Sequence, residues 1–568
     1  MKNRAVVSRS LLVVVILVLV AVLAGCGGQD ADDSAAVSKA RELCGSDDCH
    51  DDAVGMFAQG PHQAGGCLGC HEGADGAHSD DPAANDAAIV WAIDGCAGCH
   101  EAEAATYLYD DNTQAGPFGG SQIFPTQPKA TAFPHYAQIM AGNAFTKNYN
   151  EEGAHAFLLE EHVKTTRGKY EACVQCKSTK VAYAWLKGTE LTVHESTEIT
   201  LTHTQTPTAP ARVVTIPAGT KLTYKTDPDT AAVDARAVLP DGTEYTSMPE
   251  ASQDATANFN MLWAATIAVT EDTSPYGAGC NHCHDPHSGD LRIIRAAMLT
   301  QIERKGVNPY TEELITDPEQ ASRSERRSLS CAQCHVEYTC GKGVDGVDRD
   351  IFGWSKAADL VPLYTELFDM QQDWTHRDIG VPMHKSQHPE TELYWNSVHY
   401  DVGASCSDCH MPQVRTANGR VFRSHWFTSP YKYHNTELYA KFASATGLDV
   451  RFNDKPCDRC HKDRESAAVQ QQQTVFTAQQ GVEKDLAAAA AALAAVTTKK
   501  KAGGAIDTKA FDSGIAAYRQ AQTLWENLIV SENSMGFHNY NEVMGAMSDA
   551  KGLAAQATAD ARKALGEG

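Results

Sequence analysis

The chain has 568 residues, a formal net charge of −24 and 18 cysteines. Its length alone would predict roughly three or four domains. Its acidity argues against binding to nucleic acid, whose phosphates attract basic surfaces, and favours a basic redox partner.

The start of the chain is typical of an exported lipoprotein. A basic beginning precedes an apolar run over residues 11–23, which ends in Leu-Ala-Gly-Cys at Cys26. The run is short for a membrane span, and its end resembles a bacterial lipobox, whose cysteine is lipidated. We predict a signal peptide over 1–25, a flexible tether over 26–43 and a lipid-anchored location outside the cytoplasmic membrane, periplasmic or at the cell surface. An uncleaved anchor is the alternative.

Six segments repeat the pattern C-x-x-C-H. They contain Cys67, Cys70 and His71; Cys96, Cys99 and His100; Cys280, Cys283 and His284; Cys331, Cys334 and His335; Cys406, Cys409 and His410; and Cys457, Cys460 and His461. This pattern attaches c-type haem: two thiols join the porphyrin and the histidine binds the iron. Zinc ribbons do not need that histidine, and a redox disulfide would occur once. We therefore predict haem at each motif.

Two further segments vary the pattern. Cys44, Cys49 and His50 have a longer spacer, which is compatible with haem attachment or with a disulfide. Cys173 and Cys176 are followed by Lys177 instead of a histidine. Eight haem motifs use 16 of the 18 cysteines and leave Cys26 and Cys340.

Lys177 predicts a haem with a different function. A lysine has an ordinary pKa of about 10.4 and must lose its proton to bind iron, which a desolvated site beside a metal makes possible. A haem with two histidine ligands only passes electrons. A haem with one special ligand and an open opposite position can bind a substrate.

The segments between the motifs divide the chain into two parts. Residues 44–134 form an expected three-haem domain with little apolar pattern of its own, and residues 135–568 a five-haem domain. The overall fold class is a mainly α multihaem cytochrome c, with a haem-packed core, long C-terminal helices over about 466–568 and a small β insertion over about 187–246. The alternating segments of that insertion are Glu190–Glu195, Glu198–His203, Arg212–Ile216 and Lys221–Tyr224.

The insertion and the C-terminal tail carry no haem motif. We expect four to six strands in the insertion, which forms a partner, oligomer or channel surface or has no function. Helices are predicted over 467–496, over 511–530 and from about 541, because apolar residues there follow a helical period. Such helices most simply form an antiparallel bundle and a dimer face.

Four further stretches resemble one enzyme family. They are Cys331-Ala-Gln-Cys-His-Val-Glu-Tyr338, His384-Lys-Ser-Gln-His-Pro-Glu390, Ser424-His-Trp-Phe-Thr-Ser-Pro430 and Glu532-Asn-Ser-Met-Gly-Phe-His538. With the lysine motif followed by four histidine motifs, the chain resembles the ammonia-forming pentahaem cytochrome c nitrite reductases. It is more closely similar to their octahaem relatives, which have three additional N-terminal haems.

The resemblance implies a distal pocket over the Lys177 haem. Arg167, Tyr338 and His388 would line it. The chemistry agrees, since an arginine provides a fixed cation for an anionic substrate, and histidine and tyrosine can donate protons. In the octahaem branch, Cys340 would be cross-linked to the ring of Tyr338; a free buried thiol is the alternative.

The resemblance also implies ligands for the other irons and for a calcium ion. His155, His399, His425 and His538 would be distal iron ligands. The N-terminal haems would draw theirs from His62, His78, His135 and His162, with His287 as a further candidate; the sequence does not assign these. Glu337, the carbonyls of Tyr338 and Lys385, and Gln387 match the calcium site, where a protein cation replaces the ion in some members.

The expected activity is the six-electron reduction of nitrite to ammonium, with hydroxylamine and sulfite as further candidate substrates. The electron donor would be a quinol-linked membrane cytochrome or a small cytochrome, and the protein would be a homo-oligomer, a dimer or higher. The rivals are an octahaem oxidoreductase of sulfite, tetrathionate or hydroxylamine, and a non-catalytic electron conduit.

Overall fold

The structure is a computed structural model. It describes residues 61–62, 71–72, 88–89, 93–109, 132–143, 155–159, 174–201, 212–227, 229–246, 277–306, 308, 311–312, 318, 321–338, 341–342, 348–349, 352–353, 356, 359, 362, 374–387, 389–434, 436–448, 461–462, 464–526 and 534–567. The predicted signal peptide and tether lie outside these residues. So do Cys44, Cys49, His50, Cys67, Cys70, His78, His162, Arg167, Cys173, Cys340, His388, Cys457 and Cys460.

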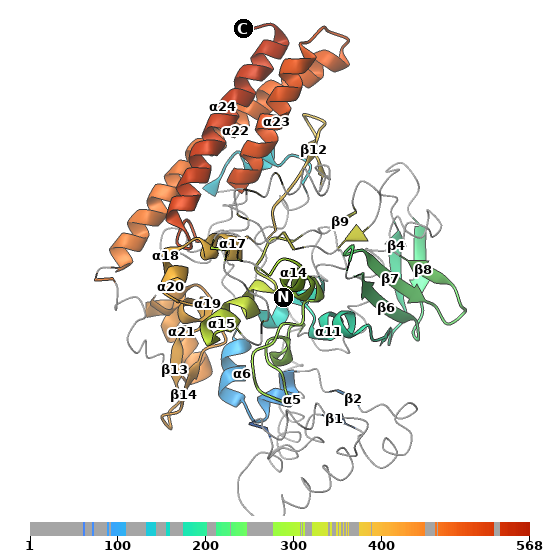
Figure 1. Ribbon diagram of the computed structural model, residues 1–568, viewed down its shortest axis with the longest axis vertical. Helices are drawn as coiled ribbons and strands as arrows, with labels where there is room; N and C mark the ends of the chain where they lie inside the picture. Colours follow the sequence, from blue (N-terminus) through green and yellow to red (C-terminus); the bar gives the residue numbers. More distant parts are fainter. Residues whose placement is uncertain are drawn as a thin grey trace, which may run out of the picture.

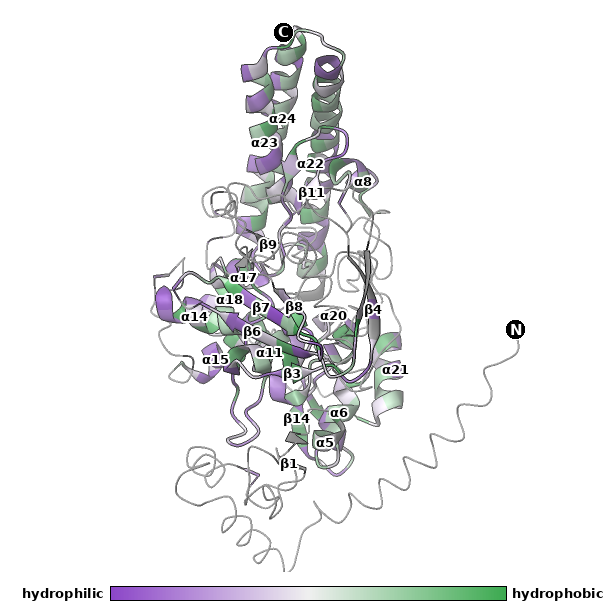
Figure 2. Cartoon of the chain, turned by 90° about the vertical axis from the view of Figure 1, so that its right-hand side faces the viewer, coloured by the Kyte–Doolittle hydropathy of each residue, from purple (hydrophilic) through white to green (hydrophobic). Residues whose placement is uncertain are grey.

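Three long helices form a bundle that extends from the rest of the molecule (Figure 1). They are α22 (Arg464–Lys501), α23 (Thr508–Glu526) and α24 (Tyr540–Leu565). Helix α22 continues five residues beyond its predicted end, and three of these residues are lysine, which is a strong helix former. Figure 2 shows both hydrophilic and hydrophobic stretches along these helices, as expected for amphipathic packing.

The β strands expected after the lysine motif are present as two antiparallel groups. Strands β3 (Leu191–Thr192), β6 (Lys221–Thr226), β7 (Val233–Val238) and β8 (Glu244–Thr246) form one sheet in that order, and β4 (Thr197–Leu201) pairs with β5 (Arg212–Ile216). Trp185 of α11 (Thr179–Lys187) stacks on Tyr224 of β6 with ring centroids 4.2 Å apart. The sheet is therefore fixed to the helix that directly follows Lys177.

The rest of the described chain consists of short elements. The helices are α5 (Ile93–Ala97), α6 (Glu101–Tyr107), α8 (Tyr136–Ile139), η3 (His155–Phe157), η4 (Cys280–His282), α14 (Ala296–Arg304), α15 (Arg323–Ala332), α17 (Glu390–Trp395), α18 (Val398–Asp401), α19 (Cys406–His410), α20 (Pro430–His434) and α21 (Thr436–Thr446). The strands pair as β1 (His71–Glu72) with β2 (Ala88–Ile89), β9 (Gly341–Lys342) with β10 (Asp348–Arg349), β11 (Trp374–Thr375) with β12 (Pro382–Met383), and β13 (Gln413–Arg415) with β14 (Val421–Arg423). Across the described ranges, no helix is long and apolar enough to cross a membrane.

Helix α6 of the predicted N-terminal domain packs directly on residues from the later part of the chain. Glu103 forms an ion pair with Arg420, and Tyr107 donates a hydrogen bond to the carbonyl of Ala278. Thr106 accepts a hydrogen bond from the backbone N–H of His425 over 2.9 Å. The described piece of the N-terminal region is thus joined to the later part of the chain by polar contacts.

Candidate haem-binding site

Six motif histidines each lie opposite a second imidazole. The ring centroids are 6.2 Å apart for His71 and His287, 6.0 Å for His100 and His62, 6.4 Å for His284 and His425, 6.0 Å for His335 and His155, 6.1 Å for His410 and His538, and 6.3 Å for His461 and His399. An iron that binds one imidazole on each side, through bonds of about 2 Å, holds the ring centres roughly 6 Å apart. The residues present therefore fit haem iron with two histidine ligands.

These pairs include all four histidines that the resemblance implies as distal ligands, namely His155, His399, His425 and His538. His62, a candidate for the N-terminal haems, lies opposite His100. His135 lies elsewhere, at the start of α8 against the bundle, where its backbone N–H donates to Glu483 of α22.

Burial favours the neutral form that binds metal in three of the paired histidines. At His335 burial acts in the same direction, but the neighbouring Glu390 carboxylate raises the pKa above its usual value. Burial lowers the pKa of His155 to about 3, and the neighbouring His335 adds to this. Burial likewise lowers the pKa values of His410 and His425 to about 4. A neutral imidazole has a nitrogen lone pair for iron, so these side chains need not lose a proton to bind it at neutral pH.

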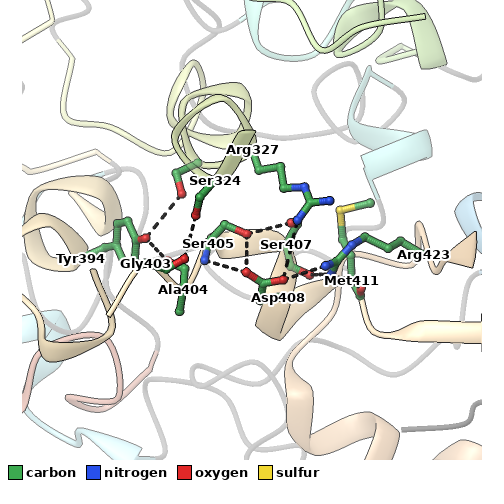
Figure 3. Close-up of polar contacts among 11 residues, drawn as sticks. Ser324, Arg327, Tyr394, Gly403, Ala404, Ser405, Ser407, Asp408, Met411 and Arg423 are labelled. Atoms are coloured by element: carbon green, nitrogen blue, oxygen red, sulfur yellow. Dashed lines mark hydrogen bonds and ion pairs between the residues drawn. The ribbon is translucent and has the colours of Figure 1, made fainter. Parts of the chain in front are cut away.

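The motif on α19 shows how a haem segment is fixed in place (Figure 3). Ser405 and Asp408 form a capping box, in which the backbone N–H of Ser405 donates to the Asp408 carboxylate over 2.8 Å. Arg423 bonds Asp408 over 2.7 Å and the carbonyl of Met411 over 3.0 Å. Burial acts to raise the pKa of Asp408, but the Ser405 hydrogen bonds and the Arg423 charge hold it below its usual value. The Nδ1 atom of His410 lies 3.1 Å from the carbonyl of Thr428, which leaves Nε2 for iron.

Cysteine contacts bring the motifs next to one another. The side chain of Cys96 lies next to that of Cys280, that of Cys176 next to Cys334, and that of Cys331 next to Cys406. His282 belongs to the motif of Cys280, and its imidazole lies 4.0 Å from the thiol of Cys334. This contact connects the Cys280 motif to the Cys331–His335 motif. The described motifs from 96 to 410 therefore form one continuous group.

Most of the described motif cysteines form no disulfide. Cys96, Cys176, Cys280, Cys283, Cys331, Cys334, Cys406 and Cys409 are free cysteines. Cys99 is disulfide-bonded in the structure, and haem attachment would require its thiol in the reduced form.

Lys177 lies in a turn that the following segment covers closely. Its backbone N–H donates to the carbonyl of Val174 over 2.9 Å, and Ser178 caps α11. A Cβ atom on Gly277 would lie 1.8 Å from the Lys177 carbonyl oxygen, so this position requires glycine. Thr179 holds the same segment through a 3.0 Å bond from its N–H to the Gly277 carbonyl.

Tyr338 is brought to this region by the motif that ends at His335. The contact of Cys334 with Cys176 places that motif beside the lysine motif, and Tyr338 follows Cys334 by four residues. The Tyr338 side chain is buried, and the Tyr338 backbone forms an isolated β bridge with Phe352. Its proposed companions Arg167, His388 and Cys340 lie outside the described residues.

Three of the four residues of the implied calcium site are joined by hydrogen bonds, and the fourth, Tyr338, directly follows Glu337 in the chain. The N–H of Gln387 donates to the Glu337 carboxylate over 2.7 Å, and the Gln387 side chain donates to the Lys385 carbonyl over 3.2 Å. Glu392 joins them, because its carboxylate accepts from the N–H of Glu337 over 3.0 Å. Both carboxylates are fully buried, and burial raises the pKa of Glu392 well above its usual value, with Glu337 adding to the shift. Buried carboxylates and carbonyls suit a hard cation, so these residues fit calcium. Such a site would combine two carboxylates with carbonyl oxygens. The described residues contain no cluster of three or more histidine, cysteine or acidic side chains that could hold a metal.

Two residues of this region escaped the sequence interpretation. Glu392 follows the family-like loop by two positions, but no local signal shows that its side chain is buried beside Glu337. Arg295 is also fully buried, with its guanidinium 5.2 Å from the Phe352 ring centre. A buried cation needs an anionic partner. This requirement singles out Arg295 only when its burial is known, and the sequence does not show that burial.

A family model agrees with this geometry. The model for cytochrome c552 matches residues 242–568, which is more than half of the chain. The chain belongs to the cytochrome c552 family.

Individual members of the cytochrome c552 family show how far the similarity extends. The chain is 30% identical over 298 residues to the cytochrome c nitrite reductase subunit of Nitratidesulfovibrio vulgaris, covering 49% of this chain and 51% of the relative. It is 30% identical over 314 residues to cytochrome c-552 of Bacteroides thetaiotaomicron, covering 54% and 55%. The chain thus spans about half the length of these curated relatives.

The fold is similar to that of the cytochrome c nitrite reductase catalytic subunit from Desulfovibrio desulfuricans. The TM-score is 0.56 at 21% identity, over 84% of this chain and 87% of that chain. That structure is described with two calcium sites.

Proposed function

We propose that this protein reduces nitrite to ammonium at a haem bound by Lys177, within a set of eight covalent haems. The observation that carries the proposal is the contrast between seven motifs. Six motif histidines lie opposite a second imidazole at 6.0–6.4 Å, whereas the seventh motif has Lys177. Filled iron positions suit electron transfer, and a single differently ligated haem suits substrate binding.

The reaction consumes one nitrite, six electrons and eight protons and yields one ammonium and two waters. The haem supplies electrons and an open coordination position when bound. Lys177 would contribute a neutral amine to the iron, so its proton must leave before binding. Arg167 would hold the anionic substrate, and His388 and Tyr338 would donate protons. The burial of Tyr338 beside the lysine motif supports its part in this assignment.

Related substrates and partners follow from the same site. Hydroxylamine lies between nitrite and ammonium in oxidation state and should also be reduced, and sulfite is a further candidate. The buried Glu337 and Glu392 support a bound calcium ion, with the Lys385 ammonium as the alternative cation. We further propose export, a lipid anchor at Cys26, a membrane or small cytochrome as donor, and a homo-oligomer.

Substitution of Lys177 tests the proposed site. Lys177→Ala should remove the reduction of nitrite by the dithionite-reduced protein, whereas exposed Lys187→Ala at the end of the following helix should retain it. His388→Ala should also suppress ammonium formation. Ammonium production that survives both Lys177→Ala and His388→Ala would refute the assignment. A protein whose haems are all low-spin and bind no added ligand would instead be an electron conduit.

A further inference from the structure

The loop 285–289 follows the motif that ends at His284 and contacts two segments from far earlier in the chain. Within this loop, Gly289 lies against Pro61, the carbonyl of Pro286 contacts His62, and His287 lies opposite His71. We propose that His287 is the second iron ligand opposite His71, that His62 is the second ligand opposite His100, and that this loop holds both. The inference rests on the proposal that these motifs carry haem.

The first pair has the arrangement of two ligands on one iron. The rings of His71 and His287 are 6.2 Å apart and nearly parallel, with an interplanar angle of 17°. Asp285 fixes the loop, because its carboxylate accepts the backbone N–H of His287 over 2.8 Å and of Ser288 over 2.9 Å. The same carboxylate lies 3.8 Å from Nδ1 of His287. A carboxylate on this side is a common outer partner of a metal-bound histidine and leaves Nε2 for the iron.

The second pair depends on the same loop. His62 and His100 have ring centroids 6.0 Å apart. Nδ1 of His62 lies 2.8 Å from the carbonyl of Pro286, next to His287. A carbonyl accepts only from a protonated nitrogen, so this contact assigns the proton to Nδ1 and leaves the Nε2 lone pair available.

The close fit of the loop against the early segment supports this placement. Gly289 has a φ of +74°, and a Cβ atom there would lie 2.8 Å from the Pro61 ring. The carbonyl of Gly289 also lies 3.4 Å from Nδ1 of His284. One short loop therefore contacts or supplies imidazoles for three motifs, those of His71, His100 and His284.

This arrangement has a consequence for electron transfer. Cys96 of the His100 motif lies next to Cys280 of the His284 motif, so two of the three motifs are neighbours. The loop would set the iron positions of both N-terminal haems relative to the His284 haem. It would thereby join the N-terminal haems to the part of the chain that matches the cytochrome c552 family.

The test is the spin state of the full-length holoprotein. His287→Ala and His62→Ala should each convert one haem from low-spin to high-spin, measured by quantitative electron paramagnetic resonance, while the mass still shows all haems attached. Added imidazole should restore the low-spin signal. The exposed histidine of the β region provides the control, and His194→Ala should leave the spectrum unchanged.

A second variant covers the case in which His287→Ala fails to mature. His287→Met retains a ligand, so the haem should stay low-spin, and the reduction potential of one haem should rise, as histidine–methionine ligation does in cytochromes c. An unchanged spin count in His287→Ala, or an unchanged redox titration in His287→Met, would overturn the inference. Absence of haem from Cys67–His71 by peptide mass would instead contradict the haem proposal itself.

Asp285→Asn tests the loop as a positioning device. The amide oxygen can still accept the two backbone N–H groups, but the negative charge beside His287 is lost. The His71 haem should therefore stay low-spin and gain a higher potential, because its ferric form loses a stabilising charge. A potential equal to that of the wild type would remove Asp285 from the proposal.

Discussion

Glu337 and Glu392 place two carboxylates in a buried site. The N–H of Glu337 donates to Glu392 over 3.0 Å, and the Glu337 carboxylate accepts from Gln387 over 2.7 Å. Burial and mutual repulsion raise the pKa of Glu392. Without a cation, ionising both carboxylates is costly; with calcium, both charges are compensated.

This pair predicts a pH dependence that calcium removes. Because the pKa of Glu392 is raised in the folded state, the stability present below its unfolded value of about 4.3 is lost as pH rises toward and through the folded value. In chelator, the melting temperature should therefore fall as the pH rises above about 4.3. Calcium should reverse this fall, and Glu392→Gln should flatten it. Equal melting curves with chelator and with calcium would argue for Lys385 as the cation.

Single residues also show what the sequence could and could not predict. The motif histidines and Lys177 carry their chemistry in local spacing, so they stand out in the sequence. The pairing of His71 with His287 joins distant segments, and no local pattern encodes it. Burial of Arg295 and Glu392 likewise depends on packing that a polar residue type does not reveal.

At the scale of elements, small residues let the three bundle helices meet closely. Ala557 of α24 is fully buried, and its carbonyl would lie 3.3 Å from a Cβ atom on Gly514 of α23. Leu493 of α22 would lie 3.2 Å from the same Cβ atom. The three helices therefore converge at Gly514.

A larger side chain at this point should force the helices apart. Ala557→Leu should destabilise the protein by about 1–3 kcal/mol, because overpacking in a filled core moves neighbouring side chains and backbone. Ala559→Leu, on the exposed side of the same helix, provides the control and should have little effect. Chemical unfolding followed by circular dichroism measures the difference. Equal stability of the two variants would contradict this packing.

The sequence predicted the type and order of the main elements more accurately than the residues at which they begin and end. Periodic alanine and apolar residues indicated three C-terminal helices, and alternation indicated the strands after Lys187. The short helices around the motifs have too few periodic residues for such a signal. Their form depends on caps such as Ser405 and Asp408 and on contacts between motifs.

At the scale of the whole molecule, α6 attaches the N-terminal region to the rest of the protein. Thr106 is fully buried, donates to the Glu103 carbonyl over 2.8 Å and accepts from the His425 N–H over 2.9 Å. The second bond reaches the backbone of a histidine paired with His284. Attachment of the N-terminal region and placement of a paired histidine are thus linked.

Removal of this hydroxyl should weaken the attachment. Thr106→Val keeps the shape but leaves the His425 N–H without its acceptor, at a cost of about 1–3 kcal/mol. Limited proteolysis should then cleave the N-terminal region faster, with the haem content unchanged. Thr498→Val is the matched control, since the exposed Thr498 hydroxyl donates to the Ala494 carbonyl within its own helix. Identical cleavage rates for both variants would contradict the role of Thr106.

Product analysis with nitrite tests the proposed activity most directly. The purified holoprotein, supplied with reduced viologen and nitrite, should form one ammonium for each nitrite consumed and oxidise six viologen radicals. Nitrite that remains unconsumed, or that disappears without ammonium, would contradict the account.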